Sequence, residues 1–329
     1  MRILFFKSFK PKFWPGILFL LFAILSAQCL FAKELPRYDI AASVDTKNHK
    51  ISASQKVTFT NNSGNPINEI YFHIYPHRKY TRKEIRFMYQ YSAYFKVNLY
   101  PEGFQSGDLK VNSIKSSGQP LAYSIEGEDQ TILKINLDAS LEPGLSREVE
   151  IDFILDIPHC WNRLGWHRDI ITLTRWYPIL SVLDKAGWHN HPFYIYHQPF
   201  FSDAAYYKLR VTLKQEEKVA CGASLKAETL NPDGTKNLVL ENESPMRDLA
   251  LAISPNFKVY SLDQDKFRIN VFYVEGNLKS AREMADYAAG AMKFYAGRFG
   301  EYPYKEFTIA PSFLGFGGDQ SSGMIFIDV

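Results

Sequence analysis

The chain has 329 residues, of which 46% are hydrophobic and 22% charged, so it is long enough for about two domains with packed cores. This composition excludes an intrinsically disordered chain. The formal net charge is +3, and removal of residues 1–32, which carry four cations and no acidic residue, leaves −1 (+3 less four). A near-neutral body excludes a nucleic-acid-binding protein that relies on a basic surface.

The first 32 residues have the pattern of a secretory signal peptide. Four cations between Arg2 and Lys12 precede an uncharged run from Phe13 to Ala32. Cleavage after Ala32 predicts a protein exported across the cytoplasmic membrane, to the periplasm or the exterior. The alternative is an uncleaved membrane anchor, because 20 uncharged residues can just span a bilayer.

Residues 33–262 are predicted to form a β-sandwich-like domain. Runs of alternating apolar and polar residues recur between turn signals, and the clearest run extends from Glu148 to Asp156. The segment from Arg78 to Tyr100 interrupts this pattern with basic and aromatic residues. Such a mixture can bind anionic polymers, but the net charge of the body favours a surface insertion with one solvated and one packed face. We expect no long amphipathic helix in this domain.

Two histidine pairs are candidate metal ligands: His73 with His77, and His189 with His191. The first pair has the spacing of a zinc helix, but Ile74 replaces the glutamate base and Pro76 would break the helix. The second pair has no third ligand nearby, so a surface pair is favoured.

Cysteines and tryptophans leave two alternatives open. Cys29 belongs to the signal peptide, and Cys160 and Cys221 are either a disulfide or, as we favour, two buried thiols. Four tryptophans fall within 28 residues: Trp161, Trp166, Trp176 and Trp188. They could form a sugar-stacking platform, but packing beneath a loop is the more common use of such clusters.

Residues 263–329 are predicted to begin an α/β domain. The strand Phe267–Val274 comes first, and a helix follows with a capping box of Ser280 and Glu283 and an end at Gly300. An apolar stripe on this helix is expected to lie against a sheet: Ala281, Ala285, Ala288, Met292, Tyr295 and Phe299. Two further strands, Phe307–Ala310 and Met324–Ile327, flank a glycine-rich segment whose backbone can approach another group closely.

This order of elements, with the sequence FGEYPYKEF and the GG-x-x-x-x-G-x-I-F spacing, resembles the gluzincin metallopeptidases of the aminopeptidase N family. In that family the strand after the paired glycines runs antiparallel to the bound peptide, and a glutamate in it binds the free amino terminus. Gln320 takes that position here by register. The resemblance therefore implies a substrate-binding segment, which consists of Gly317, Gly318, Asp319 and Gln320.

Four stretches of the β part also resemble the family. Arg175–Pro178, Gly187–Trp188 and Phe200–Asp203 resemble the part of its β domain that walls the active-site cleft. For Arg247–Ala250 the resemblance implies a structural ion pair at the domain junction.

The resemblance implies a mainly β fold: a sandwich or saddle-like N-terminal domain of aminopeptidase N type, then the first α/β portion of a thermolysin-like catalytic domain. The full-length parent would hydrolyse peptides with zinc held by two histidines and a glutamate, while a second glutamate activates water. The family's H-E-x-x-H motif does not occur here, and no histidine follows His197. We therefore expect this chain alone to be inactive, without catalytic residues or bound zinc.

A competing hypothesis is a non-catalytic exported β-sandwich module that binds a partner or acts as a scaffold through its aromatic loops. Under either hypothesis the α/β portion looks incomplete. Its helix stripe, Met324 and Phe326 should then form an exposed apolar patch.

Overall fold

The computed structural model describes residues 34–195 and 200–329. The predicted signal peptide of residues 1–32 lies outside these residues. The chain from Leu35 to Val329 forms one compact unit. No helix in the described part of the chain is both long and apolar enough to cross a membrane.

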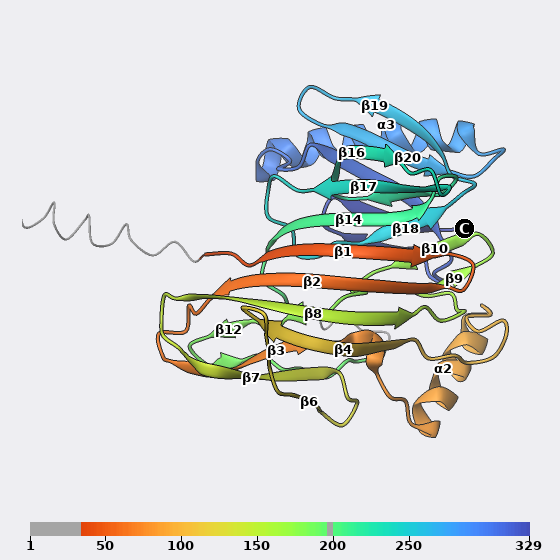
Figure 1. Ribbon diagram of the computed structural model, residues 1–329. Helices are drawn as coiled ribbons and strands as arrows, with labels where there is room; N and C mark the ends of the chain where they lie inside the picture. Colours follow the sequence, from red (N-terminus) through yellow and green to blue (C-terminus); the bar gives the residue numbers. More distant parts are fainter. Residues whose placement is uncertain (1–33, 196–199) are drawn as a thin grey trace, which may run out of the picture. The chain divides into compact units, whose positions relative to one another are not determined.

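An eight-stranded sheet is the largest layer (Figure 1), with the order β16, β17, β14, β1, β2, β8, β4, β5. The bounds are β1 Arg37–Asp45, β2 Lys50–Thr60, β4 Asp108–Ser116, β5 Gln119–Pro120, β8 Ser146–Asp156, β14 Tyr206–Lys214, β16 Ser224–Leu230 and β17 Thr235–Glu241. β1 pairs with β14 in parallel and with β2 antiparallel. The strand predicted at Glu148–Asp156 is β8, and its alternating burial confirms the prediction.

Two four-stranded sheets complete the β part, in the orders β11, β3, β7, β6 and β15, β18, β10, β9. The bounds are β3 Ile67–His73, β6 Tyr123–Glu126, β7 Ile132–Leu141, β9 Leu164–His167, β10 Ile170–Leu173, β11 Ile179–Leu180, β15 Lys218–Cys221 and β18 Leu251–Ser254, with a short pair of β12 Leu183–Asp184 and β13 Gly187–Trp188. Buried side chains of β3 and β7 share one core with those of β1 and β2. The sheets therefore stack as a sandwich, as predicted.

The expectation of no long helix in this part is wrong, because α2 occupies Arg82–Tyr94 after the short 3-10 helix η1, Tyr75–His77. A capping box starts α2: Glu84 N–H donates to Thr81 Oγ1 at 3.3 Å and Thr81 N–H donates to Glu84 Oε2 at 2.8 Å. Met88 packs with Leu99, Tyr100 and Cys160. The segment from Arg78 to Tyr100 has one packed and one solvated face, as expected, and these faces belong to the helix α2.

The C-terminal part is a five-stranded sheet in the order β19, β20, β21, β23, β22, crossed by α3. The bounds are β19 Lys258–Asp263, β20 Arg268–Tyr273, α3 Leu278–Phe299, β21 Glu306–Ser312, β22 Gly318–Ser321 and β23 Met324–Asp328. β20, β21 and β23 are parallel, whereas β22 is antiparallel to β23. The predicted order of strand, helix, strand, glycine segment and strand is confirmed.

The predicted start of α3 is wrong. The helix begins at Leu278 after Asn277, which makes no side-chain cap, so Ser280 and Glu283 lie inside it. The apolar stripe packs on the sheet over its first half, where Ala281 and Ala285 are buried and Ala288 is half-buried. A helix of 22 residues is about 33 Å long, longer than the strands it crosses. Aromatic side chains near its end therefore remain exposed: Phe294, Tyr295 and Phe299.

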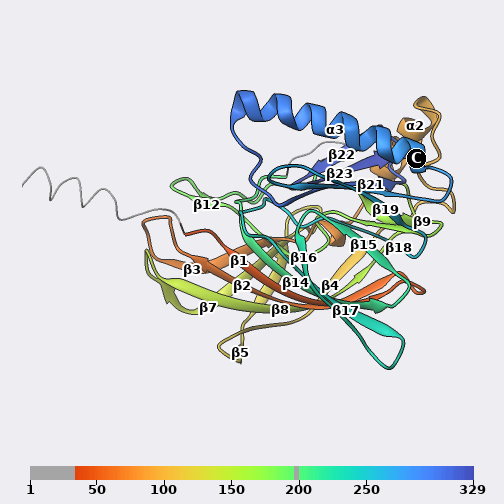
Figure 2. The ribbon, with the colours of Figure 1, turned by 90° about the horizontal axis from the view of Figure 1, so that it is seen from above.

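The two faces of this sheet are covered differently (Figure 2). α3 packs on one face, with Ile269 and Ile309. On the other face Met324 and Phe326 are fully buried against β-part residues that include Ala252. The expected exposure of Met324 and Phe326 is therefore wrong, because the β sandwich covers them.

Candidate functional site

β22 is an edge strand, because no strand in the described part of the chain pairs with its outer side. Asp328 N–H donates to the Gly317 carbonyl at 3.2 Å. In an antiparallel ladder every second residue pair is hydrogen-bonded, so the backbone groups of Asp319 also bond to β23. The backbone N–H and C=O groups of Gly318 and Gln320 then point to the open edge. An extended peptide can add to such an edge.

Asp319 and Gln320 project from opposite faces of β22. Asp319 lies opposite Phe326 and shares its face, whereas Gln320 lies opposite Ile325 on the face that carries α3. Gln320 is exposed, and Asp319 is only 1% exposed. Arg163 Nε donates to Asp319 Oδ1 at 2.7 Å, so Asp319 is committed to the β sandwich. Of the two, only Gln320 is free to meet a ligand on the α3 face.

The close approach expected of the glycines is made to the protein itself. A Cβ added at Gly222 would lie 2.1 Å from the Ser322 carbonyl oxygen, and one at Gly323 would lie 2.7 Å from the Gly222 oxygen. At Gly318 an added Cβ would lie 2.9 Å from a backbone oxygen of β23. Among the glycines of the segment from Gly315 to Gly323, only Gly317 has open space, because an added Cβ there meets no atom within 4 Å.

An ion pair holds the turn after β22, near the position that the resemblance implied. Asp248 Oδ1 accepts a hydrogen bond from Ser322 N–H at 2.9 Å, and its Oδ2 lies 3.6 Å from Arg175 Nη2. Arg247 N–H donates to Ser322 Oγ at 2.9 Å. The partner of Asp248 is therefore Arg175, whose side chain comes from the family-like stretch Arg175–Pro178.

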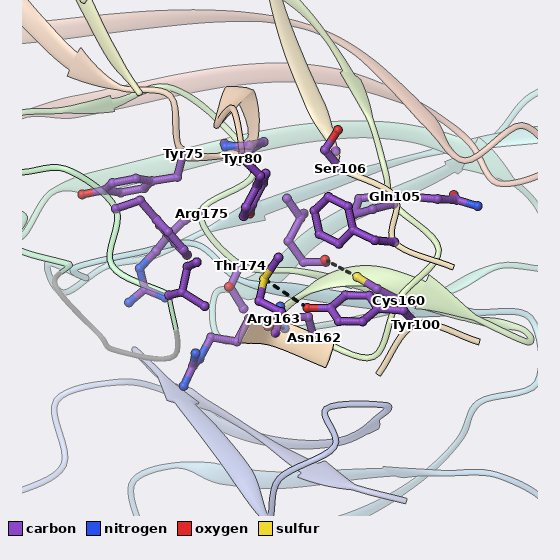
Figure 3. Close-up of a pocket in the computed structure, with 18 of the residues that line it drawn as sticks. Tyr75, Tyr80, Tyr100, Gln105, Ser106, Cys160, Asn162, Arg163, Thr174 and Arg175 are labelled. Carbon is purple, nitrogen blue, oxygen red and sulfur yellow. Dashed lines mark hydrogen bonds between the residues drawn. The ribbon is translucent and has the colours of Figure 1, made fainter. Parts of the chain in front are cut away.

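A pocket of about 100 Å³ lies in the β part, and Arg163 and Arg175 are among the residues that line it (Figure 3). Its walls are mostly aromatic or apolar, and they include Tyr80, Met88 and Tyr100. Arg163 thus lines the pocket and also binds Asp319 on β22. The pocket and the edge strand are neighbouring features.

His73, His77 and His189 each have a separate hydrogen-bond partner. His73 is buried and its Nε2 lies 3.2 Å from the His189 carbonyl, while His77 bonds to Asp108 at 2.6 Å. His189 bonds to Asp184 at 2.7 Å. Within residues 34–195 and 200–329, no three His, Cys, Asp or Glu side chains gather as metal ligands.

The tryptophans serve packing. Trp176 is 1% exposed and its Nε1–H donates to the Leu249 carbonyl at 3.0 Å. The Trp166 ring lies between His49, with ring centres 3.5 Å apart, and His159, at 4.1 Å. For these two residues the favoured interpretation is confirmed.

Cys160 and Cys221 are free and buried, as favoured from the sequence. Burial raises the pKa of each thiol to about 12. At pH 8 the thiolate fraction then falls roughly a thousandfold below that of an ordinary cysteine. In the native chain that lacks residues 1–32, we expect an aromatic disulfide reagent to leave both thiols unmodified. In urea, the same reagent should titrate both. Rapid reaction of the native protein would contradict this prediction.

Sequence reasoning missed Arg163 and the pocket. Arg163 belongs to no motif, and its partner Asp319 is 156 residues later. Its one signal is indirect: an aspartate in the glycine segment needs a cation if its side chain is buried.

No protein-family model and no curated protein sequence matches the chain. Among solved structures, a point mutant of an M1 zinc metallopeptidase from Deinococcus radiodurans matches with a TM-score of 0.57 and 14% identity over 90% of this chain and 60% of that chain. The enzyme without the mutation matches with a TM-score of 0.55, 14% identity and coverage of 89% and 59%.

A further structure of a mutant M1 enzyme from this organism, bound to a Tyr-Ser-Ala substrate, matches with a TM-score of 0.55, 14% identity and coverage of 89% and 60%. The chain spans about 60% of the length of these neighbours. At this identity the likeness establishes the fold: a β-rich N-terminal part of M1 metallopeptidase type followed by α/β structure.

Proposed function

We propose that this chain is the N-terminal portion of an exported aminopeptidase N-like zinc metallopeptidase, and that its role is to align a peptide along β22. The observation that carries the proposal is the open edge of β22, with Gly318 and Gln320 presenting backbone groups outward. The fold likeness to M1 enzymes, one of them bound to a tripeptide substrate, supports the same role. The N-terminal pattern of cations and apolar residues supports export.

The zinc of the proposed parent has no ligand set among the described residues. They do not fit a catalytic zinc site, which needs three protein ligands. The role proposed for this chain is therefore confined to peptide binding and alignment. In the gene, we expect an in-frame H-E-x-x-H motif a few tens of codons beyond Val329. Unrelated sequence there would favour the non-catalytic binding module instead.

An amide exchange experiment tests strand addition. With Tyr-Ser-Ala added to residues 33–329, NMR should show new protection from hydrogen exchange at the amides of Gly318 and Gln320. The amides of Asp319 and Ser321 should change little, because they already face β23. Protection at neither outward amide, or equal changes along the whole strand, would contradict strand addition.

Gln320→Glu should raise selectivity for peptides with a free amino terminus. The α-amino group, with a pKa of about 7.7–8.0, is largely cationic at neutral pH, and a carboxylate binds it more strongly than a neutral amide does. The gain should be about 1–2 kcal/mol, measured as the ratio of Kd values for N-acetylated and free Tyr-Ser-Ala. Asp319→Asn is the matched control and should leave the ratio unchanged, since Asp319 faces Arg163. The reverse pattern would move the amine contact to Asp319.

A further inference from the structure

The pocket lined by Arg175 has the features of a ligand site. Its walls are mostly apolar and include Met88, with Tyr80 and Tyr100 (Figure 3). A few polar side chains also line it, among them Asn162, Thr174 and Arg175. A mostly apolar cavity with a few polar groups is typical of sites for small organic ligands.

The Arg175 guanidinium makes no hydrogen bond in the described part of the chain. Its nearest carboxylate oxygen, Asp248 Oδ2, is 3.6 Å from Nη2, which is beyond hydrogen-bond distance. The guanidinium carbon lies 3.6 Å from the centre of the Phe200 ring, so the ring supports one face of the planar group. The side chain is only 15% exposed. A guanidinium that makes no hydrogen bond to the described residues, with one carboxylate oxygen 3.6 Å away, thus lines the pocket.

The backbone of Arg175 is also unusual. Its φ of 51° lies in the left-handed region, which residues other than glycine seldom adopt. The next two residues, Trp176 and Tyr177, are buried in the core and anchor the segment. This conformation costs free energy, and such costs concentrate at binding sites. It places the side chain beside the pocket.

We propose that this pocket binds an organic carboxylate with a branched aliphatic body. The planar fork of Arg175 matches the two oxygens of a carboxylate, and the body would lie against Met88 and the tyrosines. The volume sets the size: a cavity of roughly 150 Å³ holds benzene. A volume of about 100 Å³ is smaller than this and suits a small branched aliphatic body such as a leucine side chain.

The same chemistry is present in a free branched acid and in the C-terminal leucine of a peptide. Arg163, the other guanidinium of the pocket, already donates to Asp319 from Nε, so Arg175 is the assigned carboxylate partner. No residue of β22 lines the pocket. The proposal therefore goes beyond peptide alignment on β22, and either idea can fail without the other.

The test uses residues 33–329 and four probes in titration calorimetry. 4-Methylpentanoate and N-acetyl-glycyl-leucine carry the carboxylate, and their carboxamides are the uncharged partners. Arg175→Asn removes the guanidinium with a residue that tolerates positive φ. Arg168→Asn is the matched control, because Arg168 also has positive φ, at 50°, and lies 5.6 Å from the Phe313 ring centre, but does not line the pocket.

We expect one or both acids to bind about tenfold or more tightly than the matching amide. The affinity for that acid should fall about tenfold or more in Arg175→Asn and stay unchanged in Arg168→Asn. Binding of the free acid alone identifies a metabolite-like ligand, and binding of the dipeptide alone identifies a peptide C-terminus. If Arg175→Asn does not fold, Arg175→Lys keeps the charge beside Asp248 and should weaken binding by losing the fork. Absence of binding, equal binding of the amides, or unchanged affinity in the Arg175 variants would overturn the proposal.

Discussion

Replacement of Arg163 by methionine is expected to lower the free energy of unfolding by about 3–5 kcal/mol. The change removes the cation from Asp319, whose side chain is 1% exposed, and a buried carboxylate without its counter-charge is costly. Arg163 itself is only 16% exposed, so solvent screens the pair weakly. Urea unfolding of residues 33–329, followed by tryptophan fluorescence, measures the change.

Two further variants make this experiment specific. The double variant Arg163→Met with Asp319→Leu removes both charges and should recover most of the lost stability, because apolar replacement of a buried pair is often neutral. Lys50→Met is the control: Lys50 lies 2.6 Å from Asp156, but both side chains are about half exposed, so its loss should cost at most about 1 kcal/mol. Equal effects of Arg163→Met and Lys50→Met would contradict the assigned role of the buried pair.

Acidification from pH 6.5 to pH 4 is expected to remove about 3 kcal/mol of stability through His73. Burial lowers the pKa of His73 to about 4, although the contact with the His189 carbonyl opposes this shift. The unfolded chain takes up a proton near pH 6.5, whereas the folded chain does not until about pH 4. Stability is therefore complete above pH 6.5 and falls as the pH drops towards 4, by about 1.4 kcal/mol for each pKa unit.

Urea unfolding at several pH values tests this prediction. His73→Gln, which removes the imidazole, should reduce the slope between pH 6.5 and 4, and the remaining slope should come from groups such as His49 and His167, whose pKa values burial also lowers. His191→Gln should reduce the slope much less, because burial of His73 is the largest cause of its lowered pKa and the nearby His191 is a smaller one. An unchanged slope in His73→Gln would assign the acid sensitivity to other groups.

Alternation of apolar and polar residues and helical periodicity predicted several of the strands and helices correctly. The alternation at Glu148–Asp156 predicts β8, because one face of that strand is buried. The order of elements in residues 263–329 was equally readable from periodicity. The helix α2 was readable too, since Thr81 and Glu84 form a capping box, but its basic and aromatic composition hid the helical period.

Long-range contacts account for what the sequence could not predict. Met324 and Phe326 are buried by residues such as Ala252, more than 70 positions earlier. No sequence pattern near Met324 and Phe326 therefore predicts their burial. The alternation along β22 assigned Asp319 and Gln320 to opposite faces, but the partner of Asp319 is far away in the chain. Pairing across such separations has no local signature.

The parallel pairing of β1 with β14 has a consequence for the kinetics of folding. Arg37 lies beside Tyr206, 169 positions later (206 − 37), and β1 is an inner strand of the largest sheet. Until β14 has been synthesised, one side of β1 has no partner and presents an open row of backbone groups. Contacts between such distant segments slow folding, because the intervening loop must close first. The large sheet should therefore be completed only after β14 has been synthesised.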